Sequence, residues 1–333
     1  MADMYHAENR GKSLAIASFL PYLGPALGPI VGGVVTHSLR WPWVFWIMCI
    51  FNAAITVMGL LFIRESYTPV LLRRKAQKQK PGSTAALSPK HWPFWQGFFS
   101  RLSGHLARPL LLLVQRPVIQ VLAVVLALDF GIYSFLLSTL ATLYMDRYGQ
   151  SESISSLNYI AVAIGSTISA QAGGRIMDVV YRRLRDRSPD KKGRPEFRIP
   201  WLVPGVILSP AGLFWYGWSA EHGVSWVMVD AGAFVMTLGS FTVSQACMAY
   251  QLDEFAEFGA SANAATRVLS YVLGFAFPIF APQLYGRLGY GWGNSLLGFV
   301  WIALVFPVPL ALWLWGDKLR ALGRKDDQSV SGT

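Results

Sequence analysis

Apolar stretches of about twenty residues alternate with shorter polar stretches along most of the chain. A helix needs about 20 predominantly apolar residues to cross the hydrocarbon core of a bilayer. Stretches of that length occur at roughly 13–35, 43–63, 118–143, 156–177, 199–219, 225–249, 263–285 and 294–315. The pattern therefore predicts an all-α integral membrane protein with about eight transmembrane helices and with both termini on the same side.

Composition and charge agree with this class and add an orientation. Charged residues make up 14% of the chain, whereas soluble domains carry about 25%. Most of the 29 Lys and Arg residues lie at the termini and in the segments 64–117, 178–198 and 250–262 with its flank Arg267. Arg40, Arg147 and Arg287 lie in the other loops, and Arg175 lies near the end of the span 156–177. Positive-inside bias places both termini and the basic segments in the cytoplasm, so the net charge of +11 requires no nucleic acid partner.

The spacing of the spans predicts three parts. Residues 1–63 hold two helices, residues 64–117 form a basic cytoplasmic linker, and residues 118–333 hold six helices and a cytoplasmic tail. Within the linker, apolar residues recur every three or four positions over 95–110, which predicts an amphipathic helix lying on the inner leaflet. A buried helix packed beneath the transmembrane part is the alternative.

Residues 23–33, LGPALGPIVGG, combine glycine and proline inside the first apolar stretch. Gly24, Gly28 and Gly32 recur every fourth residue, which gives one helix face without side chains where a neighbouring backbone can approach closely. Local physics alone allows a simple packing face. The run also resembles the antiporter motif on the fifth helix of proton-coupled exporters of the major facilitator superfamily. The matching residues are Gly24, Gly28, Pro29, Gly32 and Gly33.

Further segments extend the resemblance over nearly all of the chain. GRPEFRIP at 193–200, AGLFWYGWSA at 211–220 and LGYGWGNSLL at 288–297 are similar to signatures of the fungal drug:proton antiporter group. The resemblance implies a major facilitator fold whose first four helices are absent, with the chain beginning at the family's fifth helix. It also implies outward transport of drugs or secondary metabolites by alternating access.

A degenerate second copy of the superfamily's cytoplasmic loop signature starts at Gly174. Asp178 ends a helix there, and Arg182 and Arg183 follow within about one turn. This spacing allows a charge latch at the cytoplasmic face. A solvated loop without a switching role is the alternative, because exposed ion pairs contribute only about 0 to 1 kcal/mol.

Asp129 is the most informative polar residue inside a predicted span. It lies about eleven residues into its helix, near the bilayer midplane at about 1.5 Å per residue. An ionised carboxylate there costs about 3 kcal/mol, so Asp129 should face a cavity or a partner and could carry a proton. Tyr133 lies one turn away and completes the predicted site. A structural Asp129 hydrogen-bonded to a neighbouring helix is the alternative.

A polar stripe follows on the helix at 225–249 and extends past its end. Its members fall on one side of a helical wheel, with Gln245 flanking them. They are Asp230, Thr237, Ser240, Ser244 and Gln251. Phe234, Phe241 and Met248 lie on the same side, which predicts the mixed wall of an organic-ligand cavity. Each hydroxyl could instead bond its own backbone.

These observations predict an exporter of small amphipathic organic compounds that exchanges them for protons in the lipid bilayer. We expect no cofactor, no metal and no enzymatic activity, because the five His residues are scattered and no nucleophile or phosphate-binding motif is present. The plasma membrane is favoured over the vacuolar membrane. Two alternatives stay open: an inactive fragment that needs its missing first half or a partner chain, and a membrane enzyme such as a terpene cyclase using Asp129 and Asp230.

Overall fold

The computed structural model describes residues 24, 28–36, 38–62, 71, 72, 75, 109–189, 191, 193–255 and 259–330, the side chains of 322–330 excepted. All its regular elements are helices. Their bounds are α2 Pro42–Phe62, α5 Pro117–Tyr148, α6 Glu152–Leu157, α7 Tyr159–Arg187, the 3₁₀ helix Pro195–Arg198, α8 Ile199–Glu221, α9 Trp226–Glu254, α10 Gly259–Val305 and α11 Val308–Val330. The predicted linker helix at 95–110 lies outside the described residues except for its last two positions.

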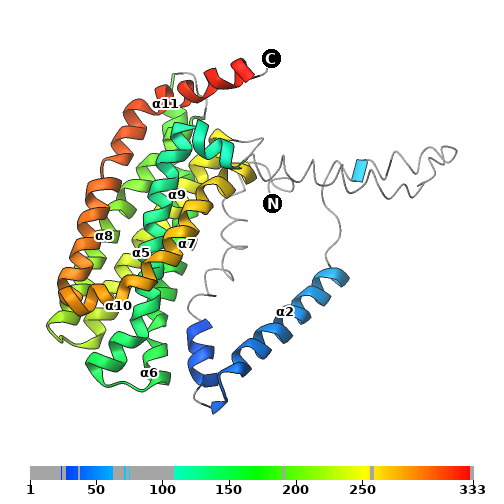
Figure 1. Cartoon of the computed structure of the whole chain (residues 1–333). Coiled ribbons are helices and arrows are strands. Elements are labelled where there is room, and N and C mark those ends of the chain that lie inside the picture. Colours follow the sequence, from blue (N-terminus) through cyan, green and yellow to red (C-terminus); the bar gives the residue numbers. More distant parts are fainter. Residues whose placement is uncertain are drawn as a thin grey trace.

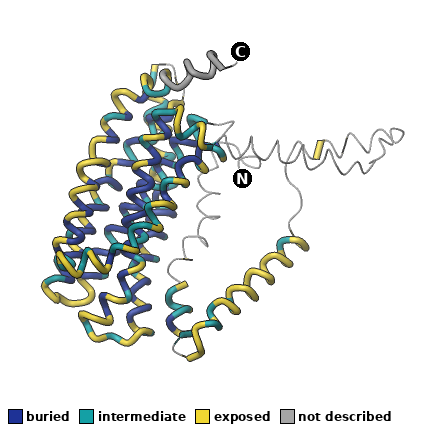
Figure 2. The backbone as a smooth tube through the Cα atoms, in the orientation of Figure 1, coloured by how far each residue is buried: buried dark blue, intermediate teal, exposed yellow. Residues whose placement is uncertain are grey.

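Helices α5 and α7–α11 form one bundle of long, roughly antiparallel helices (Figure 1). The long helix α5 lies at its centre, where it contacts α9 and α10, and α8 contacts both α9 and α10. Most residues of α5 are buried, including Leu122, Ile132, Phe135 and Leu140, whereas the outer helices are exposed on one face (Figure 2). A membrane would cover that exposed apolar face.

Local sequence explains where the central helix begins and ends. Pro117 occupies the first turn of α5, where its missing N–H is no loss, and Arg116 before it is extended. At the other end Gly149 adopts a left-handed conformation with φ 61°, and its N–H donates to the carbonyl of Tyr144. This is the usual glycine termination of a helix.

Helix α10 contains two membrane crossings joined by a sharp break. Gly289 has φ 72° and ψ 178°, values that interrupt the helix and favour glycine. The carboxylate of Glu221, the last residue of α8, accepts a hydrogen bond from the N–H of Gly291 at 3.1 Å. Glu221 therefore satisfies a backbone donor that the break leaves free.

Five segments of the described residues are long and apolar enough to cross a membrane, and the last of them, Gly259–Ala321, has 63 residues. Two predicted spans differ in detail from the helices of the structure. Helix α7, predicted as 156–177, packs in the bundle against α9 but is too polar overall to meet the same standard. The span predicted at 294–315 is interrupted between α10 and α11 by Phe306 and Pro307. The first predicted span, 13–35, is described only in part.

Helix α2 stands apart from the bundle (Figure 1). It is strongly apolar, yet all of its residues are exposed or half-buried.

The bundle has two ends, and we name them the basic end and the opposite end. The basic end carries the α7–α8 and α9–α10 connections, and the opposite end carries α6 and the α8–α9 connection.

Candidate functional site

Asp129 lies near the middle of α5, as the sequence predicts, and its side chain is buried with 5% exposure. The side chain of Ser240 on α9 contributes a hydrogen bond to the carboxyl group. The other oxygen, Oδ1, has no hydrogen-bond partner among the described residues. Leaving a buried acceptor without a partner costs free energy. Binding a proton or a ligand at the Asp129 carboxyl group would remove that cost.

Tyr133 lies one turn further along α5 and is also buried. Its ring packs edge-on against Phe241 of α9, with ring centroids 5.5 Å apart. Its hydroxyl has no hydrogen-bond partner within the described part of the chain. The structure thus brings Asp129, Tyr133 and Ser240 together between α5 and α9, with an aromatic wall beside them.

Arg267 on α10 is a member of this site that the sequence reasoning missed. It is half-buried and its charge attracts the carboxylate of Asp129. No described residue forms a hydrogen bond or an ion pair with it within 4.0 Å. The distribution of basic residues assigns Arg267 to the flank of a cytoplasmic loop. Arg267 lies eight residues after the start of α10, about 12 Å along the helix. That depth inside an apolar helix is the signal that could have identified it as a member of the site.

The polar stripe of α9 extends over most of the length of the helix. From Asp230 to Gln251 the helix advances by about 31 Å, the depth of a bilayer. The hydroxyl of Thr237 is fully buried and donates to the carbonyl of Ala233 at 2.8 Å. Ser244 and Gln245 are half-buried. Thr237 therefore packs rather than faces a cavity.

Gln245 retains the contacts expected of a wall residue. Its Nε2 donates to the carbonyl of Ala170 on α7 at 3.4 Å, and its Oε1 has no partner among the described residues. Its Oε1, on α9, is a further buried oxygen without a described partner, beside those of Asp129 and Tyr133 on α5.

Asp230 lies in a separate place, toward the opposite end of the bundle. The hydroxyl of Tyr144 donates to its Oδ1 at 2.5 Å. Because Ser240, the partner of Asp129, is ten residues further along α9, the two carboxyl groups are separated by about 15 Å along the helix. The two acids of the cyclase alternative therefore do not share a site.

The described residues also include no group of three or more His, Cys, Asp or Glu placed to hold a metal.

A network of ion pairs closes the basic end, and it corrects the predicted latch. Asp178 pairs with Arg198, at 2.9 Å, and not with Arg182 or Arg183. Arg182 donates instead to the backbone carbonyl of Asp178 at 3.3 Å, and the half-buried Gly174 lies one turn before it. The Arg198 side chain also bonds Asp253 at the end of α9, at 2.8 Å.

A second arginine extends the network to α11. Arg320 pairs with Glu196 of the 3₁₀ helix at 2.8 Å and with Glu254 of α9 at 3.0 Å, and it also contacts Asp317. The hydroxyl of Tyr250 donates to Glu196 at 3.3 Å. Arg198 and Arg320 together tie the basic ends of α7, α8, α9 and α11.

Comparison with known proteins places this architecture in a family. The model of the Major Facilitator Superfamily matches residues 1–278. The chain belongs to this superfamily. It is 39% identical over 332 residues to the probable efflux pump mfs2 of Aspergillus flavus, covering 96% of this chain and 76% of the relative. It is 35% identical to the efflux pump vrtL of Penicillium aethiopicum, covering 97% of this chain and 64% of the relative.

A third relative is the uncharacterized transporter C1529.01 of Schizosaccharomyces pombe. The two chains are 34% identical, and the match covers 98% of this chain and 67% of the relative. The chain therefore spans about two thirds to three quarters of the length of these superfamily members.

The residues of the predicted antiporter motif are described in part. A β-carbon added at Gly24, Gly28 or Gly32 would meet no described atom within 4 Å, so the close approach expected there is not made by the described residues. Gly33 is buried, and a β-carbon at its position would overlap the side chain of Ser156 on α6. Three residues later, the hydroxyl of Thr36 donates to Glu152 at 2.9 Å. Gly33 is thus the position of the motif at which close packing is found.

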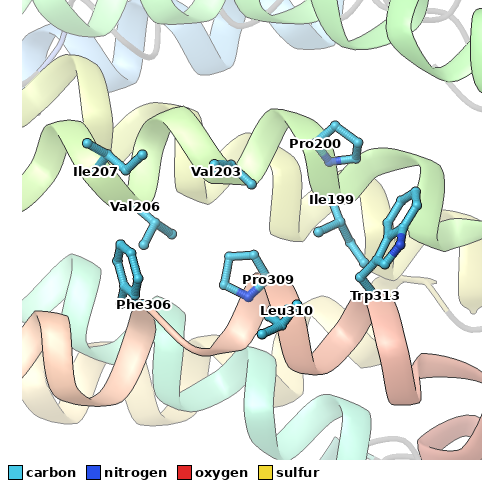
Figure 3. Close-up of a pocket in the computed structure, with 9 residues that line it drawn as sticks. All are labelled: Ile199, Pro200, Val203, Val206, Ile207, Phe306, Pro309, Leu310 and Trp313. Atoms are coloured by element: carbon cyan, nitrogen blue, oxygen red, sulfur yellow. The ribbon is translucent and has the colours of Figure 1, made fainter.

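A groove of about 370 Å³ lies on the outer face of the bundle (Figure 3). Its nine lining residues are apolar, and Figure 3 shows Val203 of α8 facing Pro309 and Leu310 of α11. Without a polar group the groove cannot orient a substrate. Its lining includes none of Asp129, Tyr133 and Ser240, so we do not assign it to the site.

Proposed function

We propose that this protein exports small organic compounds across a membrane in exchange for protons, by alternating access. Membership of the superfamily and the names of its relatives support transport of small compounds. The finer step, proton exchange, is carried by one observation: Asp129 is buried between α5 and α9 with one oxygen unpartnered and Arg267 nearby.

In this proposal Asp129 alternates between two forms. The neutral form is tolerated by its apolar surroundings, and the ionised form is stabilised by Ser240 and by the charge of Arg267. A carboxyl group for which neither form is strongly favoured can release and accept a proton as access alternates. Tyr133 and Gln245, whose oxygens lack described partners, would bind polar atoms of the substrate, and Phe241 would contact its apolar part.

The orientation that goes with this proposal places the basic end in the cytoplasm. The segment 178–198 and Arg267 carry the positive charge there. The opposite end, with α6 and Asp230, is then external. We further propose the plasma membrane as its location.

The test is export by cells that lack their own pumps. Yeast expressing the protein is loaded with rhodamine 6G, and efflux is measured with and without a protonophore. Asp129→Asn keeps the shape of the side chain but removes its proton cycle, so we expect efflux to fall to the level of cells without the protein. The matched control is Asp186→Asn, which removes an exposed carboxylate paired with Arg185. Protonophore-sensitive efflux that persists in Asp129→Asn would refute the proton role.

A second candidate is that residues 1–333 export only together with further helices. The exposure of α2 favours it, since an apolar helix whose residues are all exposed or half-buried lacks protein neighbours within the described residues. Gly28 and Gly32 present a similarly open face. The test is efflux by residues 1–333 with and without the unmatched segment of the Aspergillus flavus relative supplied as a separate chain. Equal efflux in both cases would exclude this candidate.

A further inference from the structure

A second polar pocket, of about 350 Å³, lies between α5 and α10 near the opposite end of the bundle. Its polar lining residues come from the last third of α5 and from both sides of the α10 break. They are Ser138, Thr139, Thr142, Asp146, Tyr285 and Tyr290. Ser138 is nine residues beyond Asp129, about 14 Å along α5. The pocket is therefore separate from the site around Asp129.

The charge of this pocket is negative. Asp146 is the charged residue among the described residues that line it, and no described cation lies within 4.0 Å of its carboxylate. The neighbouring Arg147 forms no ion pair with it, and its guanidinium donates to the backbone carbonyl of Glu221 at 2.6 Å. Asp146 is exposed, so a cationic ligand would replace solvent at its carboxylate.

The hydroxyl groups of the wall present acceptors to the pocket. Ser138 and Thr139 both donate their hydroxyl protons to the carbonyl of Phe135, at 2.9 and 2.8 Å. Their oxygens keep lone pairs for a ligand. On the facing wall Pro282 has no N–H, so it cannot pair with the carbonyl of Pro278, and both prolines line the pocket. Such a wall suits a ligand that donates hydrogen bonds.

Two aromatic rings complete the pocket. The centroids of Tyr285 and Tyr290 are 4.5 Å apart. Asn294 fixes the first ring by donating from Nδ2 to the Tyr285 hydroxyl at 3.0 Å. The faces of such rings attract cations and their bodies pack against apolar groups.

We propose that this pocket binds a protonated amine attached to a small apolar or aromatic group. The carboxylate of Asp146 pairs with the ammonium and the tyrosine rings contact the apolar part. The oxygens of Ser138 and Thr139, about 10 to 12 Å away along α5, are too far to accept from the same ammonium and would accept from another donor of a larger ligand. The described residues that line the pocket include no Lys, Arg or His to pair with an anion. The external position of the pocket rests on the proposed orientation, but binding itself does not depend on export.

The test is equilibrium binding to the purified 333-residue chain in lipid nanodiscs. Phenethylamine, which is charged at pH 7, and 2-phenylethanol, its neutral counterpart of similar size, are titrated by calorimetry, with empty nanodiscs subtracted. We expect saturable binding of the amine and at least about tenfold weaker binding of the alcohol, as for loss of one hydrogen-bonded charge. Equal affinity for the two, or no saturable binding of the amine, would overturn the proposal.

Variants separate this pocket from other carboxylates. Asp146→Asn should weaken amine binding at least about tenfold, and Tyr290→Leu should weaken it through the lost ring. Glu152→Gln changes an exposed carboxylate at the same end but outside the pocket, and it should leave binding unchanged. Because binding is measured without transport, failure of the proton proposal is visible separately. Unaltered amine affinity in Asp146→Asn, with an unchanged thermal midpoint, would refute the site.

Discussion

The guanidinium of Arg198 lies 2.9 Å from the carboxylate of Asp178, a residue 20 positions earlier on a different helix. The same side chain bonds Asp253, 55 positions later, and lies over the ring of Tyr181 with its central carbon 4.1 Å from the centroid. One arginine at the start of α8 therefore holds the ends of α7 and α9. Because the side chain is only 14% exposed, its loss would leave two carboxylates partly buried and unpaired.

We predict that Arg198→Ala destabilises the bundle by about 3 kcal/mol, the usual scale for breaking a largely buried pair. The measurement is the thermal midpoint of the detergent-solubilised protein. Arg185→Ala is the control, because its pair with Asp186 is solvent-exposed and should contribute about 0 to 1 kcal/mol. Equal midpoints for the two variants would mean that the Arg198 pairs do not support the fold.

The elements that depend on local sequence could be predicted. Hydrophobic stretches gave the positions of α2, α5, α8 and α9, and the gap between 285 and 294 anticipated the break at Gly289. Asp129 was found because a carboxylate inside an apolar span is costly. These signals lie within one helix, so no knowledge of packing was needed.

The contacts between helices could not be predicted in the same way. A helical wheel gives the direction of a side chain but not its neighbour, so it grouped Asp230 with Ser240 although they bond α5 at different depths, at Tyr144 and at Asp129. The partner of Asp178 was sought nearby in sequence at Arg182, whereas the fold supplies Arg198. Arg267 was missed because a count of loop charges does not record which helix face an arginine occupies.

Helices α8 and α9 cross closely enough to require glycine at the contact. A β-carbon at Gly232 would overlap the backbone nitrogen of Tyr216, which belongs to the facing helix and cannot move aside easily. We predict that Gly232→Val prevents correct assembly, seen as loss of the monodisperse peak in size-exclusion chromatography. Gly286→Ala is the control, since no atom of the described residues lies within 4 Å of its added carbon. A monodisperse Gly232→Val protein would show that the two helices can separate at little cost.

The proposed orientation predicts which positions react from outside the cell. In a Cys49→Ser background, cysteines introduced at Arg40 and Arg287 should react with a membrane-impermeant maleimide on intact cells, because both positions are exposed and belong to the connections with few basic residues. Cysteines at Lys78 and Arg187 should react only after the cells are opened. The reverse pattern would invert the assignment of the two ends.

The contact between Gly33 and Ser156 predicts a compensating pair of substitutions. Gly33→Ala places a carbon where the Ser156 side chain lies, so it should force the helix at 28–36 away from α6 and break the bond from Thr36 to Glu152. Ser156→Gly removes the obstructing atoms and should restore the contact in the double variant. The readout is disulfide formation between Thr36→Cys and Glu152→Cys introduced in each background. We expect cross-linking in the parent, little with Gly33→Ala, and recovery when Ser156→Gly is added. Cross-linking that Gly33→Ala leaves unchanged would mean that Gly33 is not what allows the two helices to meet, because a real overlap cannot be relieved without moving one of them.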